Sequence, residues 1–118
     1  MTGAEFKTLR ESLNLPVSWV ARQGGVRERT VSYWEASGAP VPQDMERLLL
    51  DVEQKLNQLA TADAEGIPLL RYRTDADLWK HKPEMRPLPA TAYAAMLGWR
   101  RRHLLAAGRP APIDWFQP

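Results

Sequence analysis

The chain has 118 residues, a formal net charge of +2 and no cysteine. This length allows one domain, or a small domain with an oligomerisation element. The absence of cysteine excludes disulfides and thiolate metal sites. No apolar stretch is long enough for a signal peptide or a membrane span, so we expect a cytoplasmic protein that does not enter a membrane. The small net charge gives no argument for a nucleic-acid partner.

The first predicted element is an amphipathic helix that begins at Thr2 or Gly3. Its apolar side chains recur with helical spacing and should form a buried stripe: Phe6, Leu9 and Leu13. Its charged side chains are expected to face water: Lys7, Arg10 and Glu11. Pro16 disfavours helical backbone at the residue before it, so the helix should end between Leu13 and Pro16.

The stretch from Val17 to Gly38 predicts two helices joined by a tight turn, at about Val17–Gly24 and Arg27–Ala36. Gly24-Gly25 supplies the turn, because glycine takes positive φ without a steric clash. Trp19 lies beside the narrow core stripe of the first helix. It either packs in the core, which is the commoner outcome, or rests on DNA.

The second of these helices has an apolar and a polar face. Val31 and Trp34 form an apolar pair at positions i and i+3. The opposite face carries the candidate base-contacting side chains: Arg27, Glu28, Arg29, Ser32 and Tyr33. Donors, acceptors and an aromatic hydroxyl on a rigid helix are what reading base edges in a major groove requires. The pattern therefore predicts a helix-turn-helix that binds DNA.

The order of residues along this stretch resembles the lambda-repressor-like (Xre/Cro) DNA-binding domain. The matching residues are Val20-Ala21, Gly25-Val26, Thr30-Val31-Ser32, and Glu35 with Gly38. The chain departs from that pattern in two places. Pro16-Val17 stands where a Ser or Thr cap and a phosphate-contacting Gln are usual, and one extra residue separates Glu35 from Gly38. The first departure bears on one phosphate contact, and neither changes the expected fold.

We expect Arg29 to donate two hydrogen bonds to the O6 and N7 atoms of a guanine. Glu28 either accepts from a cytosine amino group or caps its helix. Thr30 is expected to lie half inward. Phosphate contacts, which position a protein on the duplex, are expected from these side chains: Lys7, Arg10, Arg22 and Thr30.

A long helix follows Pro42, which suits a first helical turn. Its apolar stripe comprises Met45, Leu48, Leu49, Val52, Leu56 and Leu59. Residues 61–68 have the composition of a linker, in which Asp63 and Glu65 should be solvated. We therefore divide the chain into a helix-turn-helix DNA-binding domain, residues 1–62, and a C-terminal homodimerisation domain, residues 63–118.

The second half predicts a small α+β domain, so the fold class is mainly α. It contains one short strand near Leu70–Arg73, a helix at Asp75–Lys82 and a helix at about Ala90–Ala107 that Gly108 ends. The segment from Ile113 to Phe116 adds a short extended piece.

Two features of the second half predict a partner chain. The strand needs a neighbour, which is either the segment near residue 113 or the same strand of a second subunit. The helix is apolar on nearly every side from Ala90 to Trp99, which predicts burial on every side. The expected dimer-interface residues are Leu70, Tyr72, Tyr93, Met96, Leu97 and Trp99. A monomer with its terminus folded back is the alternative.

The whole chain resembles the YdiL-like proteins, which join an N-terminal Xre-type domain to a C-terminal dimerisation domain. Anti-CRISPR-associated regulators of the second type, from phages, share this build. The residues that carry the resemblance are Leu9-Arg10, Arg29-Thr30, Tyr33-Trp34-Glu35, Val41-Pro42, Leu70-Arg71-Tyr72 and Trp99. The resemblance implies a dimeric repressor that binds a palindromic operator of double-stranded DNA, often at its own operon. It also implies that Arg29 is the leading base-contacting side chain.

No arrangement of residues suggests catalysis, because His81 and His103 are isolated and no glycine-rich phosphate loop follows a strand. We expect no enzyme activity, no cofactor and no metal. An antitoxin of a toxin–antitoxin pair is an alternative, and its toxin-binding tail would be disordered when free. A regulator that also binds RNA is another, using Arg100-Arg101-Arg102, although these residues equally suit a solvated helix end.

Overall fold

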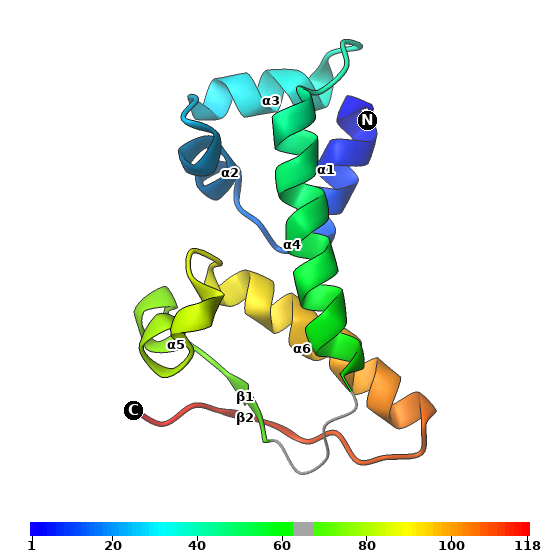
Figure 1. Cartoon of the computed structure of the whole chain (residues 1–118), viewed down its shortest axis with the longest axis vertical. Coiled ribbons are helices and arrows are strands. Elements are labelled where there is room, and N and C mark those ends of the chain that lie inside the picture. Colours follow the sequence, from blue (N-terminus) through cyan, green and yellow to red (C-terminus); the bar gives the residue numbers. More distant parts are fainter. Residues whose placement is uncertain (63–67) are drawn as a thin grey trace. The chain divides into compact units, whose positions relative to one another are not determined.

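The structure is a computed structural model that describes residues 1–62 and 68–118. It is mainly helical with a short two-stranded sheet (Figure 1), which agrees with the expected fold class. The chain divides into two compact units, Met1–Gln54 and Lys55–Pro118, and each is described by itself. Over the described ranges, no helix combines the length and apolar character needed to cross a membrane. The expectations for Asp63 and Glu65 fall outside the described residues.

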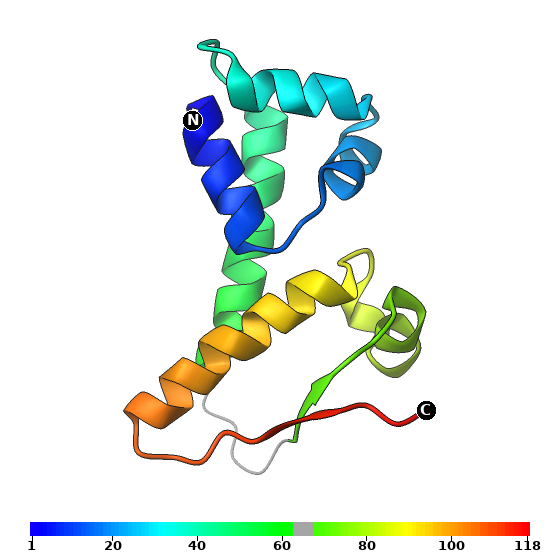
Figure 2. The same cartoon turned by 180° about the vertical axis from the view of Figure 1, so that it is seen from behind.

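The first unit contains α1 (Gly3–Ser12), α2 (Val17–Gly24), α3 (Glu28–Ala36) and most of α4 (Gln43–Thr61). In Figures 1 and 2, α1 runs beside α4 and α3 lies across their ends, where it also packs against α2. These bounds follow local signals in the sequence. The helix that was predicted from Arg27 begins one residue later, because Arg27 has an extended backbone.

The ends of α1 and α2 show why the helices stop where they do. Thr2 and Glu5 form a reciprocal capping box at the start of α1, in which each side chain accepts a backbone N–H of the other residue. Gly25 has a φ of 65° and ends α2 in the left-handed region, as the turn prediction requires. The N–H of Val26 then donates to the carbonyl of Ala21 at 3.0 Å, which closes the turn.

The core of the first unit is built from one face of each helix. Its buried apolar side chains are Phe6, Leu13, Leu15, Trp19, Val20, Ala21, Val31, Val41, Met45, Leu49 and Val52. Trp19 is only 5% exposed, which confirms that it packs in the core and excludes contact with DNA through its ring. Leu9 and Leu48 are half-buried, so the buried apolar stripes of α1 and α4 are narrower than predicted.

Arg10 does not face water as expected, and its guanidinium is the main polar contact inside the first unit. Its Nε and Nη2 donate to the two carboxylate oxygens of Glu35 at 2.7 and 3.0 Å, and Nη1 donates to the Leu15 carbonyl at 3.0 Å. The two side chains are 11% and 7% exposed. The hydrogen bonds that Arg10 donates to Glu35 raise the pKa of Arg10 above its ordinary value. The expectation was wrong because the acceptors come from α3 and the α1–α2 turn.

We expect Arg10→Ala to lower the free energy of unfolding by roughly 2–4 kcal/mol, because it leaves the Glu35 carboxylate buried without its cation. Lys7→Ala on the same helix is the matched control and should change it by less than about 0.5 kcal/mol, since Lys7 is exposed. Urea unfolding followed by circular dichroism measures both. Equal stability of the two variants would contradict a stabilising role for this ion pair.

The second unit contains the end of α4 and a sequence of short elements. They are β1 (Leu69–Arg71), α5 (Asp75–His81), the 3-10 turn η1 (Pro83–Met85), α6 (Ala90–Ala106) and β2 (Ile113–Trp115). β1 pairs with β2 in parallel, with Leu70 opposite Asp114. The described residues therefore form two strands where one was predicted, and the segment near residue 113 supplies the neighbour that β1 needs. The strand no longer argues for a second subunit.

An aromatic cluster fills the space between the strands and α6. The Tyr72 ring lies 5.0 Å from the ring of Phe116 and 5.5 Å from that of Tyr93, and its hydroxyl is hydrogen-bonded to Nδ1 of His81. Burial raises the pKa of Tyr93 to about 12. Four of the predicted interface residues are in this unit's own core: Tyr72, Tyr93, Met96 and Leu97. The single chain thus already buries these four side chains, partly by packing β1 against α6, and their place at a dimer interface stays a prediction.

Arg100 is buried and ends α4 rather than joining a basic surface. It is 6% exposed, and its Nη1 donates to the carbonyls of Leu59 at 3.2 Å and Ala62 at 2.7 Å. The last carbonyls of a helix have no partner within the helix, so a cation here satisfies them and interacts favourably with the helix dipole. Arg101 and Arg102 remain exposed. The three consecutive arginines therefore do not form one surface.

Candidate nucleic-acid interface

The outward face of α3 carries the candidate base-contacting residues. All five are exposed: Arg27, Glu28, Arg29, Ser32 and Tyr33. Tyr33 is 62% exposed, which is more than the exposed apolar side chains Leu50, Leu105, Ile113 and Trp115. Val31 on the inner face is fully buried, as the helical spacing predicted, and Trp34 is half-buried. Four of the five thus lie on the exposed side of α3, and Arg27 lies just before its first residue.

These side chains are not used to hold the fold. Among residues 1–62 and 68–118, no hydrogen bond or ion pair engages the side chain of Arg29, Ser32 or Tyr33. The same is true of Glu28, so the structure does not support the alternative in which it caps the helix. Instead, it lies in the first turn, where a carboxylate is favourable beside the helix dipole. The outward face is therefore available to a ligand.

The inner side of α3 is fixed closely against α1. A Cβ atom placed on Gly3 would lie 2.3 Å from the Trp34 carbonyl oxygen, so only glycine permits this approach. The bidentate contact between Arg10 and Glu35 fixes the same end of α3. A rigidly held helix loses little conformational freedom on binding, which favours a specific contact.

The predicted phosphate-contacting residues have different environments. Lys7 and Arg22 are exposed, and Thr30 is half-buried as expected. Arg10 is committed to Glu35 and Leu15, so it is not available for a phosphate without breaking those bonds. We leave Arg10 out of the candidate interface.

The second unit has an exposed aromatic and basic group that sequence analysis missed. The Cζ atoms of Arg71 and Arg73 lie 5.3 and 4.4 Å from the centre of the Trp115 ring. Such contacts are cation–π interactions, which are weak at exposed sites. The alternation of Leu70-Arg71-Tyr72-Arg73 indicated exposed arginines, but not their aromatic neighbour, which lies more than 40 residues further on.

We expect Arg29→Ala and Tyr33→Ala each to change the free energy of unfolding by less than about 0.5 kcal/mol, since neither side chain packs in the core. Val31→Ala on the same helix should cost about 2 kcal/mol, because it leaves a cavity in the core. Thermal unfolding of the three variants tests this. A large loss of stability in Arg29→Ala would show that the residue supports the fold.

The chain is similar to the Aca2 repressor of Pectobacterium phage ZF40, with 30% identity over 113 residues. The match covers 91% of this chain and 90% of the phage protein, so it extends over both units. No family model matches the chain.

Proposed function

The chain belongs to the Aca2 repressor family, and from this premise we propose that it is a transcriptional repressor that binds DNA sequence-specifically. In this proposal α2, the turn at Gly25 and α3 form a helix-turn-helix, with α3 as the recognition helix. The observation that carries the proposal is the outward face of α3, where five polar side chains are exposed and are not needed by the fold. A catalytic activity forms no part of the proposal.

In the proposed complex, α3 enters the major groove and its N-terminal half faces the base edges. Arg29 donates two hydrogen bonds to a guanine, since a guanidinium matches the O6 and N7 acceptors. Arg27, Ser32 and Tyr33 share base and phosphate contacts near it, and Glu28 accepts from a cytosine amino group. The phosphate contacts come from Lys7, Arg22 and Thr30.

One recognition helix contacts only about four base pairs, so the proposal includes a homodimer that binds an inverted repeat with half-sites about 34 Å apart. Of the six residues predicted at the interface, Leu70 and Trp99 keep exposed surface in the single chain. We propose these two for the dimer interface. The proposed homodimer is supported by the need for two α3 helices and by the family resemblance. The apolar surface of α6 no longer supports it, because α6 is largely buried by its own chain.

The name of the phage relative supports repression, and the resemblance to anti-CRISPR-associated regulators extends the proposal to its target. We propose that the protein represses its own operon, which includes an anti-CRISPR gene, in the cytoplasm of a bacterial host. The packed core of residues 68–118 favours this function over an antitoxin with a disordered tail. The burial of Arg100 removes the three-arginine surface on which the RNA-binding alternative depended.

Selection of bound fragments from random duplex DNA should yield a palindromic site. On that site, Arg29→Ala should cost about 1–3 kcal/mol of binding free energy and relax the preference at one base position. Lys80→Ala, which removes one exposed charge in the second unit, is the control and should leave affinity unchanged. Unaltered operator affinity of Arg29→Ala, measured by anisotropy at fixed salt, would contradict the docking of α3.

Light scattering at micromolar concentration should give one species of twice the chain mass. Trp99→Asp should shift this species toward the monomer, because it places a charge in the proposed interface. Glu84→Gln, at an exposed position in the same unit, is the matched control. A wild-type chain that stays monomeric would remove the homodimer from the proposal.

A further inference from the structure

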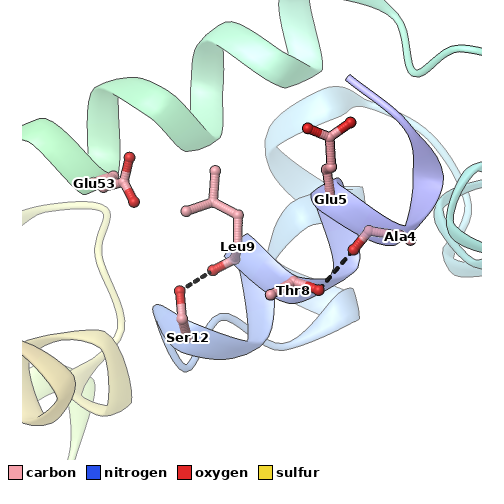
Figure 3. A pocket seen from close by; sticks show the side chains of 6 residues that line it. All are labelled: Ala4, Glu5, Thr8, Leu9, Ser12 and Glu53. Carbon is pink, nitrogen blue, oxygen red and sulfur yellow. Dashed lines mark hydrogen bonds between the residues drawn. The ribbon is translucent and has the colours of Figure 1, made fainter.

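α1 and α4 leave an open groove of about 430 Å³ on the first unit (Figure 3). Six residues line it: Ala4, Glu5, Thr8, Leu9, Ser12 and Glu53. Figure 3 shows the Leu9 side chain directed toward α4, between the carboxylates of Glu5 and Glu53. The groove therefore has an apolar centre with a negative charge on either side.

The remaining polar groups of the groove are already satisfied. The Thr8 hydroxyl donates to the Ala4 carbonyl and the Ser12 hydroxyl donates to the Leu9 carbonyl, each at 2.7 Å. The hydrogen bonds that Glu5 accepts from Thr2 lower the pKa of Glu5 below its ordinary value, so its carboxylate stays ionised. A matching occupant has one apolar side chain with a cation on either side.

The end of α6 has this chemistry. Leu105 near the end of α6 is 47% exposed, and the exposed Arg101 and Arg102 lie four and three residues before it. Residues at these spacings lie on the same side of a helix. The other exposed apolar residues fit less well: Tyr33 belongs to the proposed DNA-binding face, and Leu50 has the acidic Glu46 four residues before it. The arginines beside Trp115 already lie over its ring, and Ile113 precedes an aspartate.

We propose that the groove between α1 and α4 receives Leu105 from a second copy of the chain, with Arg101 and Arg102 of that copy beside Glu5 and Glu53. This inference rests on the proposed homodimer. In a two-fold dimer the contact occurs twice, once for each subunit. The first unit of each subunit then contacts α6 of the other subunit. This contact limits the range of distances between the two α3 helices. Exposed ion pairs are individually weak, so the contact is reversible.

Because the chain has no cysteine, single introduced thiols report this contact without background. Chains carrying Thr8→Cys in the groove are mixed with chains of different mass carrying Ala106→Cys beside Leu105, refolded together and oxidised mildly. We expect a cross-linked product with one chain of each kind. Lys7→Cys replaces Thr8→Cys in the control, because Lys7 is exposed on another side of α1. The groove thiol should give at least a several-fold higher yield.

The outcomes separate this inference from the homodimer. Dimers by light scattering with no excess of cross-linking over the Lys7→Cys control would overturn the docking and leave the homodimer in place. A monomeric chain would remove both. A chain carrying both Thr8→Cys and Ala106→Cys, diluted with excess wild-type chain, should lose most of its cross-linking; a product that persists within one chain would overturn the assignment to a second copy.

A charge exchange tests the two ion pairs separately from the apolar contact. Glu53→Arg should lower the yield of the mixed cross-link several-fold, and adding Arg102→Glu to the Ala106→Cys chain should restore much of it. Circular dichroism checks that each variant is folded. An undiminished yield in Glu53→Arg would overturn the role of charge in the docking.

Discussion

The contact of Arg10 with Glu35 and Leu15 is the constraint on which the first unit depends. One guanidinium joins the end of α3, the helix α1 and the turn that leads into α2. By holding Glu35 against α1, the guanidinium also fixes which side of α3 faces the core and which side faces solvent. Because a planar guanidinium can bond a carboxylate with two parallel hydrogen bonds, the contact fixes direction as well as distance. A lysine at this position could not do the same.

Much of the secondary structure could be predicted because the signals are local. Pro16, Gly25 and Gly108 each determine an element end through their own backbone. The division of α3 into a buried Val31 and an exposed Arg29 likewise follows from a spacing of few residues. In the candidate site, exposure could therefore be derived from periodicity alone.

The errors concern partners that lie far apart in the sequence. Arg10 and Arg100 look like solvated charges until Glu35 and the end of α4 are placed beside them. Similarly, the composition of an apolar helix predicts that it is buried, but it does not indicate whether residues of its own chain or of another chain bury it. Here its own chain supplies the cover, because β1 packs against α6 and the Tyr72 ring meets that of Tyr93. Such contacts depend on topology, which no short pattern encodes.

Within the described residues, no side-chain hydrogen bond or ion pair ties the outward face of α3 to the rest of the chain, and this has a consequence for its tolerance of substitution. Substitutions there leave the core unchanged, so under the proposed function they would alter the DNA sequence that is read without damaging the fold. The residues that face α1 have no such freedom, since Gly3 meets the backbone of α3 and Glu35 is tied to Arg10.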